Sequence, residues 1–153
     1  MKSFKMFLFC IIIFLLSYPL YSHISHGTVK EGLVMESKIL QERVRYTIYL
    51  PCDYETSNRF YPAVYLLQGY TDNDTGWIQF GEAHMLTDEA VSGRIIPPMI
   101  LVMPDASVTW YINNYDNSVR YEGFFFEEFI PYIESTYKIR SDPEKIKKNF
   151  PFK

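Results

Sequence analysis

The sequence predicts an α/β fold in which an N-terminal pair of strands leads into alternating strands and helices. Apolar and polar residues alternate over 33–50, whereas two short continuous apolar runs occupy 63–67 and 99–103. Between and after these runs, at 82–92 and 122–137, apolar residues recur with the spacing of helices. Strands that alternate with helices in this way are typical of a sheet with parallel strands and helices on its faces.

Residues 1–22 predict a signal peptide. Two lysines supply a positive start, a continuous apolar run covers 6–16, and Pro19 and Ser22 resemble the region before a cleavage site. The run is shorter than the roughly 20 apolar residues that span a bilayer, and an uncleaved anchor is the alternative. We therefore expect a secreted or periplasmic protein with no stable membrane anchor after cleavage.

The composition and the spacing of ligand-type residues exclude several classes of function. The net charge is −3 and no block of one sign occurs, so we expect no nucleic-acid partner. Cys10 lies in the signal segment, which leaves Cys52 without an internal disulfide partner. The histidines lack metal spacing, and the polar run Asp72–Gly76 departs from a calcium loop because its glycine comes one place early. We expect no metal and no cofactor.

Residues 33–50 predict an antiparallel hairpin. The second half alternates regularly and is rich in β-branched and aromatic residues, with one face formed by Val44, Tyr46, Ile48 and Leu50. Gln41–Arg43 would form the turn, and Pro51 would end the second strand.

The two continuous apolar runs predict strands that are covered on both faces. The first, Ala63–Leu67, is followed by Gly69, and the second, Met99–Met103, lies between prolines. Glu82–Ser92 fits a helix between them, which Gly93 would end. A strand, a helix and a strand at this spacing form a βαβ unit, whose two strands are parallel.

A polar aromatic loop over Asp105–Tyr121 and an amphipathic helix over about 122–137 are expected next. Pro131 should kink this helix or break its hydrogen bonding locally.

The chain then departs from the alternation of strands and helices. Another buried strand is due after a turn at 141–143, but residues 145–153 read KIKKNFPFK. We therefore expect one domain over 29–145, followed by an aberrant or truncated tail at 146–153.

Three segments occur in a recognisable order: YLLQGYTDNDTGW (65–77), ILVMPDASVTWYINN (100–114) and YEGFFFEEFIPYIESTYKIRSDPEK (121–145). Together they resemble the esterase family of α/β-hydrolases that includes esterase D, feruloyl esterases and the mycolyltransferase antigens. The resemblance covers about 29–145. It implies a partial α/β-hydrolase fold, with an antiparallel hairpin that leads into a mostly parallel sheet with flanking helices.

The resemblance also implies hydrolysis of carboxylic esters, or acyl transfer from them, through a serine, an acid and a histidine. In this family the serine lies in a G-x-S-x-G turn shortly after the segment that matches Tyr137–Glu144, and the acid and the histidine follow it. No G-x-S-x-G occurs in the 153 residues. The serines at 92, 107, 118 and 135 lack the flanking glycines. We therefore expect a fold truncated before the nucleophile strand, no catalytic triad residue in this chain, and no appreciable ester turnover.

Gly69 and Tyr70 are the candidates for an oxyanion hole. The resemblance implies that the backbone N–H of the residue after this glycine, here Tyr70, holds the negative charge that develops on the ester. Gln68 stands where histidine is commoner in the family, a change that a backbone donor tolerates. The alternative is that Gly69 is an ordinary turn glycine after a strand.

Trp77, Trp110 and Tyr111 are the candidates for substrate binding. They lie in loops at the carboxyl ends of the predicted parallel strands, where open α/β sheets bind ligands. The sequence holds 13 Tyr and 12 Phe, and this ring surface suits either a large core or a cleft for rings and sugars. Packing roles fit these three residues equally well. The expected partner is a small-molecule or carbohydrate-linked ester, such as a feruloyl or acetyl ester.

Two alternatives stand beside the esterase hypothesis: a noncatalytic protein that binds carbohydrate or ester, and a nonfunctional frameshift fragment. In the family's sheet order, the strand at 63–67 lies next to the strand that bears the serine. Without that neighbour, we expect an open apolar edge and poor solubility.

Overall fold

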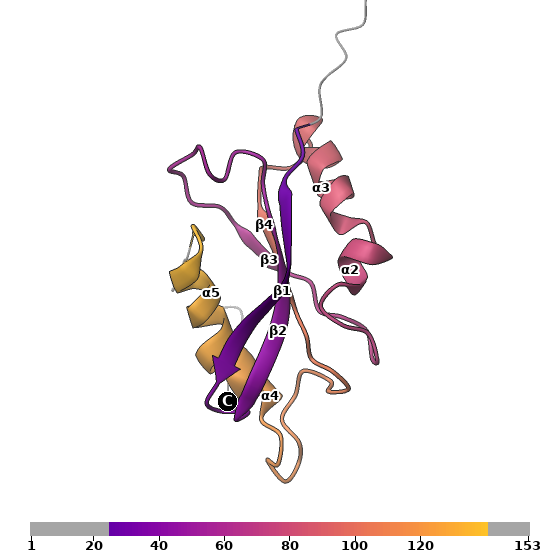
Figure 1. Ribbon diagram of the computed structural model, residues 1–153, viewed down its shortest axis with the longest axis vertical. Helices are drawn as coiled ribbons and strands as arrows, with labels where there is room; N and C mark the ends of the chain where they lie inside the picture. Colours follow the sequence, from indigo (N-terminus) through magenta and orange to yellow (C-terminus); the bar gives the residue numbers. More distant parts are fainter. Residues whose placement is uncertain (1–24, 141–153) are drawn as a thin grey trace, which may run out of the picture.

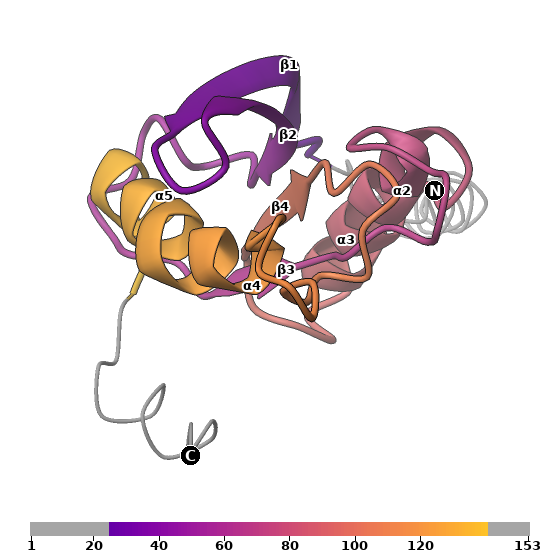
Figure 2. The ribbon, with the colours of Figure 1, turned by 90° about the horizontal axis from the view of Figure 1, so that it is seen from below.

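The computed structural model describes residues 25–140, which form a four-stranded sheet between two groups of helices (Figure 1, Figure 2). The strands are β1 (Thr28–Ser37), β2 (Glu42–Leu50), β3 (Ala63–Tyr65) and β4 (Ile100–Pro104). The helical elements are α2 (Gly76–Gln79), α3 (Ala83–Ser92), α4 (Tyr121–Phe124), the π-helical turn η1 (Phe125–Phe129) and α5 (Ile130–Thr136). The predicted signal peptide at 1–22, the turn at 141–143 and the tail at 146–153 lie outside the described residues.

The strand order is β1-β2-β4-β3, so that β2 and β4 are central and β1 and β3 lie at the edges. β1 pairs antiparallel with β2, and β2 antiparallel with β4, whereas β3 and β4 are parallel. The predicted hairpin and the predicted βαβ unit are thus confirmed. Among the described strands, parallel pairing is limited to β3 and β4, and the sheet is mixed.

The hairpin turn occupies 38–41 rather than the predicted 41–43. Its position coincides with a contact to the helical layer, where the Glu128 carboxylate accepts hydrogen bonds from the backbone N–H of Lys38 (3.2 Å) and of Ile39 (3.3 Å). This contact joins segments far apart in the sequence, so no local pattern indicates it.

Side chains of the central strands alternate between two cores of unequal size. Tyr46, Ile48 and Val102 belong to a large core with residues of α4, η1 and α5 on one face of the sheet (Figure 2). Tyr49 and Leu101 belong to a small core with a residue of α2 on the other face.

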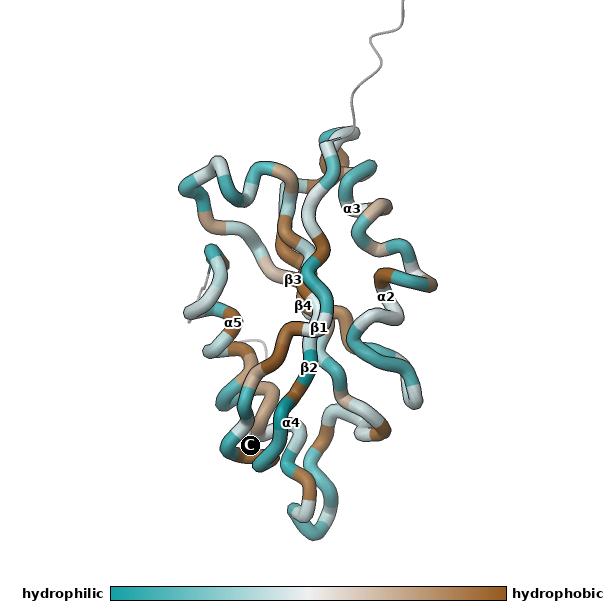
Figure 3. The backbone as a smooth tube through the Cα atoms, in the orientation of Figure 1, coloured by the Kyte–Doolittle hydropathy of each residue, from teal (hydrophilic) through white to brown (hydrophobic). Residues whose placement is uncertain are grey.

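The two parallel strands differ in burial. β4 is buried along its whole length, as predicted for the run 99–103, and belongs to the hydrophobic centre of the sheet (Figure 3). β3 is shorter than the predicted strand at 63–67, and Val64 (37%) and Leu67 (41%) are exposed. The prediction of a strand covered on both faces therefore holds for β4 and not for β3, because β3 lies at an edge of the sheet.

The predicted amphipathic helix is present as the continuous series α4, η1 and α5. Pro131 lies in the first turn of α5, directly after the π-helical turn. Proline has no N–H, and its ring clashes with the carbonyl group four residues earlier in a regular α-helix. The wider turn of η1 relieves that clash, so the predicted local break is a π-helical turn. Within 25–140, none of the helices has the length and apolar character needed to cross a membrane.

Candidate functional site at the carboxyl edge of the sheet

The loop that follows β3 and the loop that follows β4 meet at the carboxyl ends of these strands. Gln68, in the first loop, joins it to the second. Its backbone N–H donates to the Tyr111 hydroxyl (2.7 Å) in the second loop. Its side-chain Nε2 donates to the carbonyl oxygens of Ser107 (3.2 Å) and Asp72 (2.8 Å). Gln68 is only 7% exposed and therefore serves as a buried brace between the loops. The sequence identifies Gln68 only as a replacement for histidine, because its partners are distant in the chain.

The Tyr70 N–H, the predicted oxyanion donor, has no hydrogen-bond acceptor among residues 25–140. The Asp72 N–H donates to the Gly69 carbonyl (3.1 Å) and closes the turn, in which the left-handed residue is Thr71 (φ 71°). A Cβ atom placed on Gly69 would meet no atom within 4 Å. Neither a left-handed backbone nor close packing with described residues therefore requires glycine at this position, and the space beside it is open.

Asp74 anchors this loop to the sheet. Its side chain is fully buried, accepts a hydrogen bond from the Thr47 hydroxyl (2.7 Å), and lies 3.2 Å from the Arg45 guanidinium. Both partners come from β2, and they offset the cost of burying a carboxylate. Next to it, Asn73 Oδ1 accepts hydrogen bonds from the Thr75 N–H (2.8 Å) and hydroxyl (2.7 Å). The polar run predicted as a turn is thus used to hold the loop.

Two of the three predicted binding residues, Trp77 and Trp110, lie on the surface. Trp77 is 40% exposed, and its Nε1–H donates to the Leu67 carbonyl (2.9 Å), which fixes the ring. Trp110 is 70% exposed and stacks on the Tyr70 ring, with a centroid distance of 5.1 Å and an interplanar angle of 13°. Tyr70 is 55% exposed, so both rings of this stack are accessible from solvent.

Tyr111, the third predicted binding residue, packs inside the loop. Its ring meets Tyr121 edge to face, with a centroid distance of 5.3 Å and an angle of 88°, and its hydroxyl accepts the bond from Gln68. Burial raises the pKa of Tyr111 to about 12. This geometry favours the packing role over direct substrate contact.

The exposed rings of Tyr70, Trp77, Phe80 and Trp110 form what we call the aromatic rim. A pocket of about 270 Å³ opens beside two of these rings, Trp77 and Phe80. The pocket is lined by Gly69, Asp72, Gly76, Trp77, Phe80 and Gly81. Phe80 is 83% exposed, and neither this ring nor the Tyr70 ring is predicted as a binding element. An aromatic residue on the surface has the same sequence pattern as one in the core, so no signal distinguishes them.

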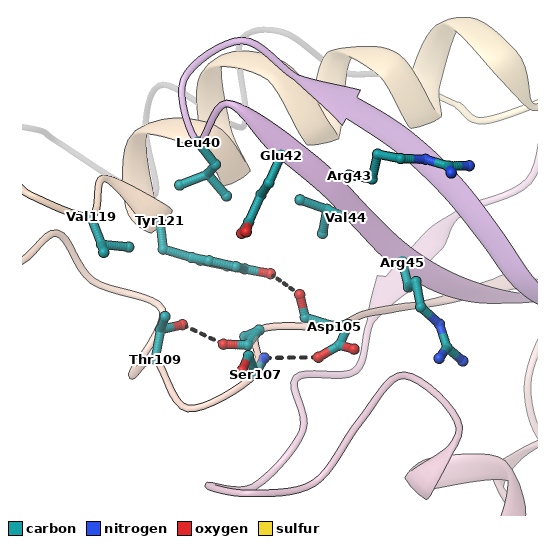
Figure 4. A pocket seen from close by; sticks show the side chains of 11 residues that line it. Leu40, Glu42, Arg43, Val44, Arg45, Asp105, Ser107, Thr109, Val119 and Tyr121 are labelled. Atoms are coloured by element: carbon teal, nitrogen blue, oxygen red, sulfur yellow. Dashed lines mark hydrogen bonds between the residues drawn. The ribbon is translucent and has the colours of Figure 1, made fainter.

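A second cavity, of about 190 Å³, lies where the start of β2 faces the loop after β4 (Figure 4). Its charged lining consists of Glu42, Arg43, Arg45 and Asp105. At its edge, the Asp105 carbonyl accepts a hydrogen bond from the Tyr121 hydroxyl (3.0 Å), and burial raises the Tyr121 pKa. The sequence does not indicate this cavity, because its charged residues come from distant segments. Its mixed charges favour neither an anion nor a cation.

The described serines do not form a nucleophile pair. Ser135 donates to the Tyr132 carbonyl (2.8 Å), and the Ser118 hydroxyl oxygen accepts from Asn114 (3.0 Å). In the part of the chain that the structure describes, no hydrogen bond joins a serine to His26 or His84. That part also contains no group of three His, Cys, Asp or Glu side chains that could hold a metal ion.

Comparisons with known proteins identify the family. A family model described as "Putative esterase" matches residues 37–147. An esterase of Mycobacterium tuberculosis is 35% identical over 96 residues, which cover 60% of this chain and 20% of that protein. An endo-1,4-beta-xylanase/feruloyl esterase of Xylanibacter ruminicola is 24% identical over 133 residues, which cover 82% of this chain and 18% of that protein.

A solved ferulic acid esterase shares the fold, with a TM-score of 0.70 and 30% identity over 76% of this chain. The chain spans 46% of that structure and about a fifth of the curated relatives. The mixed sheet with flanking helices is thus part of an α/β-hydrolase fold. Since the family model matches most of its length, the chain belongs to this esterase family.

Proposed function

We propose that this chain supplies the oxyanion donor and the substrate-binding surface of a carboxylic ester hydrolase. The observation that carries the proposal is the Tyr70 N–H, which has no acceptor within 25–140 and lies next to the aromatic rim. Loops at the carboxyl ends of strands are the usual ligand sites of open α/β sheets. Membership of the esterase family supports acyl chemistry at this place.

The proposed role of Tyr70 follows from the charge that acyl transfer creates. When a nucleophile attacks the carbonyl carbon of an ester, negative charge develops on the carbonyl oxygen. The Tyr70 N–H would donate a hydrogen bond to that oxygen, and the open space beside Gly69 would accept the carbonyl group. Gln68 and Asp74 would hold the loop in place, so that the donor is positioned before the substrate arrives.

We further propose that the 153-residue polypeptide does not turn over esters by itself. It contains no G-x-S-x-G, and a hydrogen-bond donor supplies neither a nucleophile nor a general base. Purified chain should therefore leave methyl ferulate and p-nitrophenyl acetate hydrolysing at the rate measured in buffer. Hydrolysis that follows the protein through successive purification steps would contradict this.

The proposed substrate is an ester of an aromatic acid or a carbohydrate-linked ester outside the cytoplasm. The relative from Xylanibacter ruminicola is named as a xylanase and feruloyl esterase, and one solved relative as a ferulic acid esterase. The aromatic rim offers ring faces to which aromatic acids and sugars can stack. The predicted signal peptide at 1–22 supports export.

Binding tests the rim directly. Tryptophan fluorescence should change saturably when a feruloylated oligosaccharide is added, and Trp110→Ala should weaken binding by about three- to tenfold through loss of one stacking partner. Tyr115→Ala is the matched control, because Tyr115 is fully exposed on the same loop and makes no ring contact within the described residues. Equal effects of the two substitutions would contradict a specific role for Trp110.

The same titration separates this proposal from its two alternatives. A site that retains the oxyanion donor should bind the feruloylated oligosaccharide more tightly than the same oligosaccharide without the ester. Equal affinity for both would favour a noncatalytic carbohydrate-binding protein. Binding of neither ligand would favour a nonfunctional fragment.

A further inference from the structure

The wall of the pocket beside Trp77 and Phe80 includes a carboxylate, that of Asp72. Asp72 is half-buried, and its Oδ1 accepts a hydrogen bond from the Asn73 N–H (2.9 Å). Within residues 25–140, Oδ2 accepts no hydrogen bond, and none of the ion pairs includes Asp72. An ionised carboxylate only accepts hydrogen bonds, so Oδ2 is available to a donor on a ligand.

Two glycines of the pocket make room for this carboxylate and for the Trp77 ring. A Cβ atom on Gly76 would overlap the Asp72 carboxylate, and one on Gly81 would lie 3.0 Å from Cε3 of Trp77. Neither glycine has a positive φ, so the backbone conformation requires glycine at neither position. The need for glycine comes instead from the close approach of the carboxylate and the ring.

The groups that line the pocket suit a sugar. The rings of Trp77 and Phe80 are exposed and offer apolar faces to a ligand. An apolar ring face beside a hydrogen-bond acceptor binds a sugar well, because the C–H groups pack on the ring while a hydroxyl donates to the acceptor. The volume of about 270 Å³ lies near the lower end of the range for ligand pockets, roughly 300 Å³, and fits one sugar ring.

Negative charge from both site loops acts on the space between them. Burial is the largest cause that raises the Tyr111 pKa to about 12, and the negative charges of Asp105 and Asp72 add to it. Asp72 belongs to the loop after β3, and Asp105 to the loop after β4. A ligand that brings a further negative charge to this place meets like-charge repulsion, whereas an uncharged ligand does not.

We propose, on the basis of the ester site proposed above, that Asp72 selects the substrate by charge and favours an ester of an uncharged sugar. One hydroxyl of the sugar donates to Asp72 Oδ2, and the sugar ring packs on Trp77 or Phe80. A sugar that carries a carboxylate, as a uronic acid does, places a second negative charge beside Asp72 and binds more weakly. Asp72 is thus a specificity-determining residue, which neither attacks the ester nor transfers a proton.

Two esters that differ in one group test the proposal. Feruloyl glucose and feruloyl glucuronic acid, both acylated at the anomeric oxygen, differ only in that a carboxylate replaces a CH₂OH group. Titration of the full chain at low salt, followed by tryptophan fluorescence, should show about tenfold tighter binding of the glucose ester.

Asp72→Asn should change the two affinities in opposite directions. Binding of the glucose ester should weaken by about two- to fivefold, because a neutral acceptor replaces a charged one. Binding of the glucuronic acid ester should tighten, because the repulsion is removed, so that the preference falls to about threefold or less.

Asp116→Asn is the matched control, because it removes the same charge from an exposed position outside the lining of the pocket. The preference of about tenfold should remain in this variant. If Asp72→Asn does not fold, salt gives the same test on the unmodified chain. Added salt screens the repulsion and should narrow the difference between the two esters.

The possible outcomes separate this selection from the ester site on which it depends. Equal affinity for the two esters, a preference that survives in Asp72→Asn or does not change with salt, or the same loss in Asp116→Asn would overturn the selection and leave the ester site intact. Tighter binding of feruloylcholine, which carries a quaternary cation, than of the glucose ester would overturn the assignment of a sugar. Binding of none of these esters would overturn the ester site itself, and the selection with it.

Discussion

The Tyr111 hydroxyl joins the loop after β3 to the loop after β4, so the protonation of this phenol affects the contact between them. Burial raises its pKa to about 12, whereas an unperturbed tyrosine titrates near 10. The folded state therefore holds the phenolic proton more tightly than the unfolded chain does. The stability that this provides is fully present below about pH 10 and is lost as the pH rises to about 12.

We expect Tyr111→Phe to lower the free energy of unfolding by about 1–3 kcal/mol at neutral pH, because the buried Gln68 N–H loses its acceptor. The substitution should also flatten the decline of stability above about pH 10. Tyr46, Tyr49, Tyr65 and Tyr121 also have raised pKa values and contribute the same alkaline decline to both proteins. Urea unfolding near pH 7 and near pH 11 measures both effects, and equal losses at the two pH values would contradict the argument.

The addition of a methyl group should affect stability very differently at two glycines, Gly69 and Gly27. A Cβ on Gly69 meets nothing within 4 Å, so Gly69→Ala should change stability by less than about 0.5 kcal/mol. It should nevertheless reduce the preference for the ester in the binding titration, because the methyl group enters the space proposed for the carbonyl. A Cβ on Gly27 would overlap the Tyr49 ring and the Leu50 carbonyl, so Gly27→Ala should cost about 1–3 kcal/mol. Thermal unfolding of both variants compares them, and a large loss in Gly69→Ala would show that its space is not free.

The sequence predicts Gly69 and Tyr70 as candidates for the site, and it misses residues that act through tertiary contacts. Gly69 and Tyr70 follow from their place after an apolar strand in a family motif. Gln68 and Asp74 hold the loop through partners on other segments, and no spacing reveals such contacts. Phe80 is missed because exposure of an aromatic ring leaves no mark in the sequence.

Between elements, Glu128 links the π-helical turn η1 to the β1–β2 hairpin. Its carboxylate accepts hydrogen bonds from the Ser37 hydroxyl (2.6 Å) and from two backbone N–H groups of the turn. Glu128→Ala should therefore lower the free energy of unfolding by about 1–3 kcal/mol, since three donors lose their acceptor.

Glu127→Ala is the matched control for that substitution. Glu127 lies on the same turn, and its contact with Arg120 (3.4 Å) is exposed to solvent, where an ion pair contributes about 0–1 kcal/mol. Chemical denaturation of the two variants should show the larger loss for Glu128→Ala. Similar losses would mean that the hairpin does not depend on this carboxylate.

The sequence predicts a helix or strand well where the pattern of nearby residues determines it, and less well where its place in the fold determines it. The alternation over 44–50 and the apolar run at 99–103 predict β2 and β4 because both strands are central and well covered. The strand at 63–67 shortens to β3 because its environment depends on its place in the sheet, which is not a local property. Pro131 predicts a break in the helix, but it does not predict that the break is a π-helical turn, in which Phe125 and Phe129 are buried.

At the scale of the whole molecule, the two faces of the sheet contribute unequally to stability. The core under α4, η1 and α5 includes Phe124, Phe129 and Ile133, which are all 0% exposed. Among the residues that the structure describes, the opposite core has four buried members: Tyr49, Ile78, Leu101 and Met103. Hydrophobic stabilisation increases with the apolar area removed from water, so folding should depend mainly on the first face.

This asymmetry predicts a large difference between two phenylalanine substitutions. Phe129→Ala would leave a cavity in the larger core and should cost about 3–5 kcal/mol, a large fraction of the 5–15 kcal/mol that stabilises a typical domain. Phe80→Ala removes a ring that is 83% exposed and should cost less than about 0.5 kcal/mol. Circular dichroism during urea unfolding measures both. If Phe80→Ala destabilised the chain as strongly as Phe129→Ala, the aromatic rim would be part of the folding core, and the argument that its exposed rings are reserved for a ligand would fail with it.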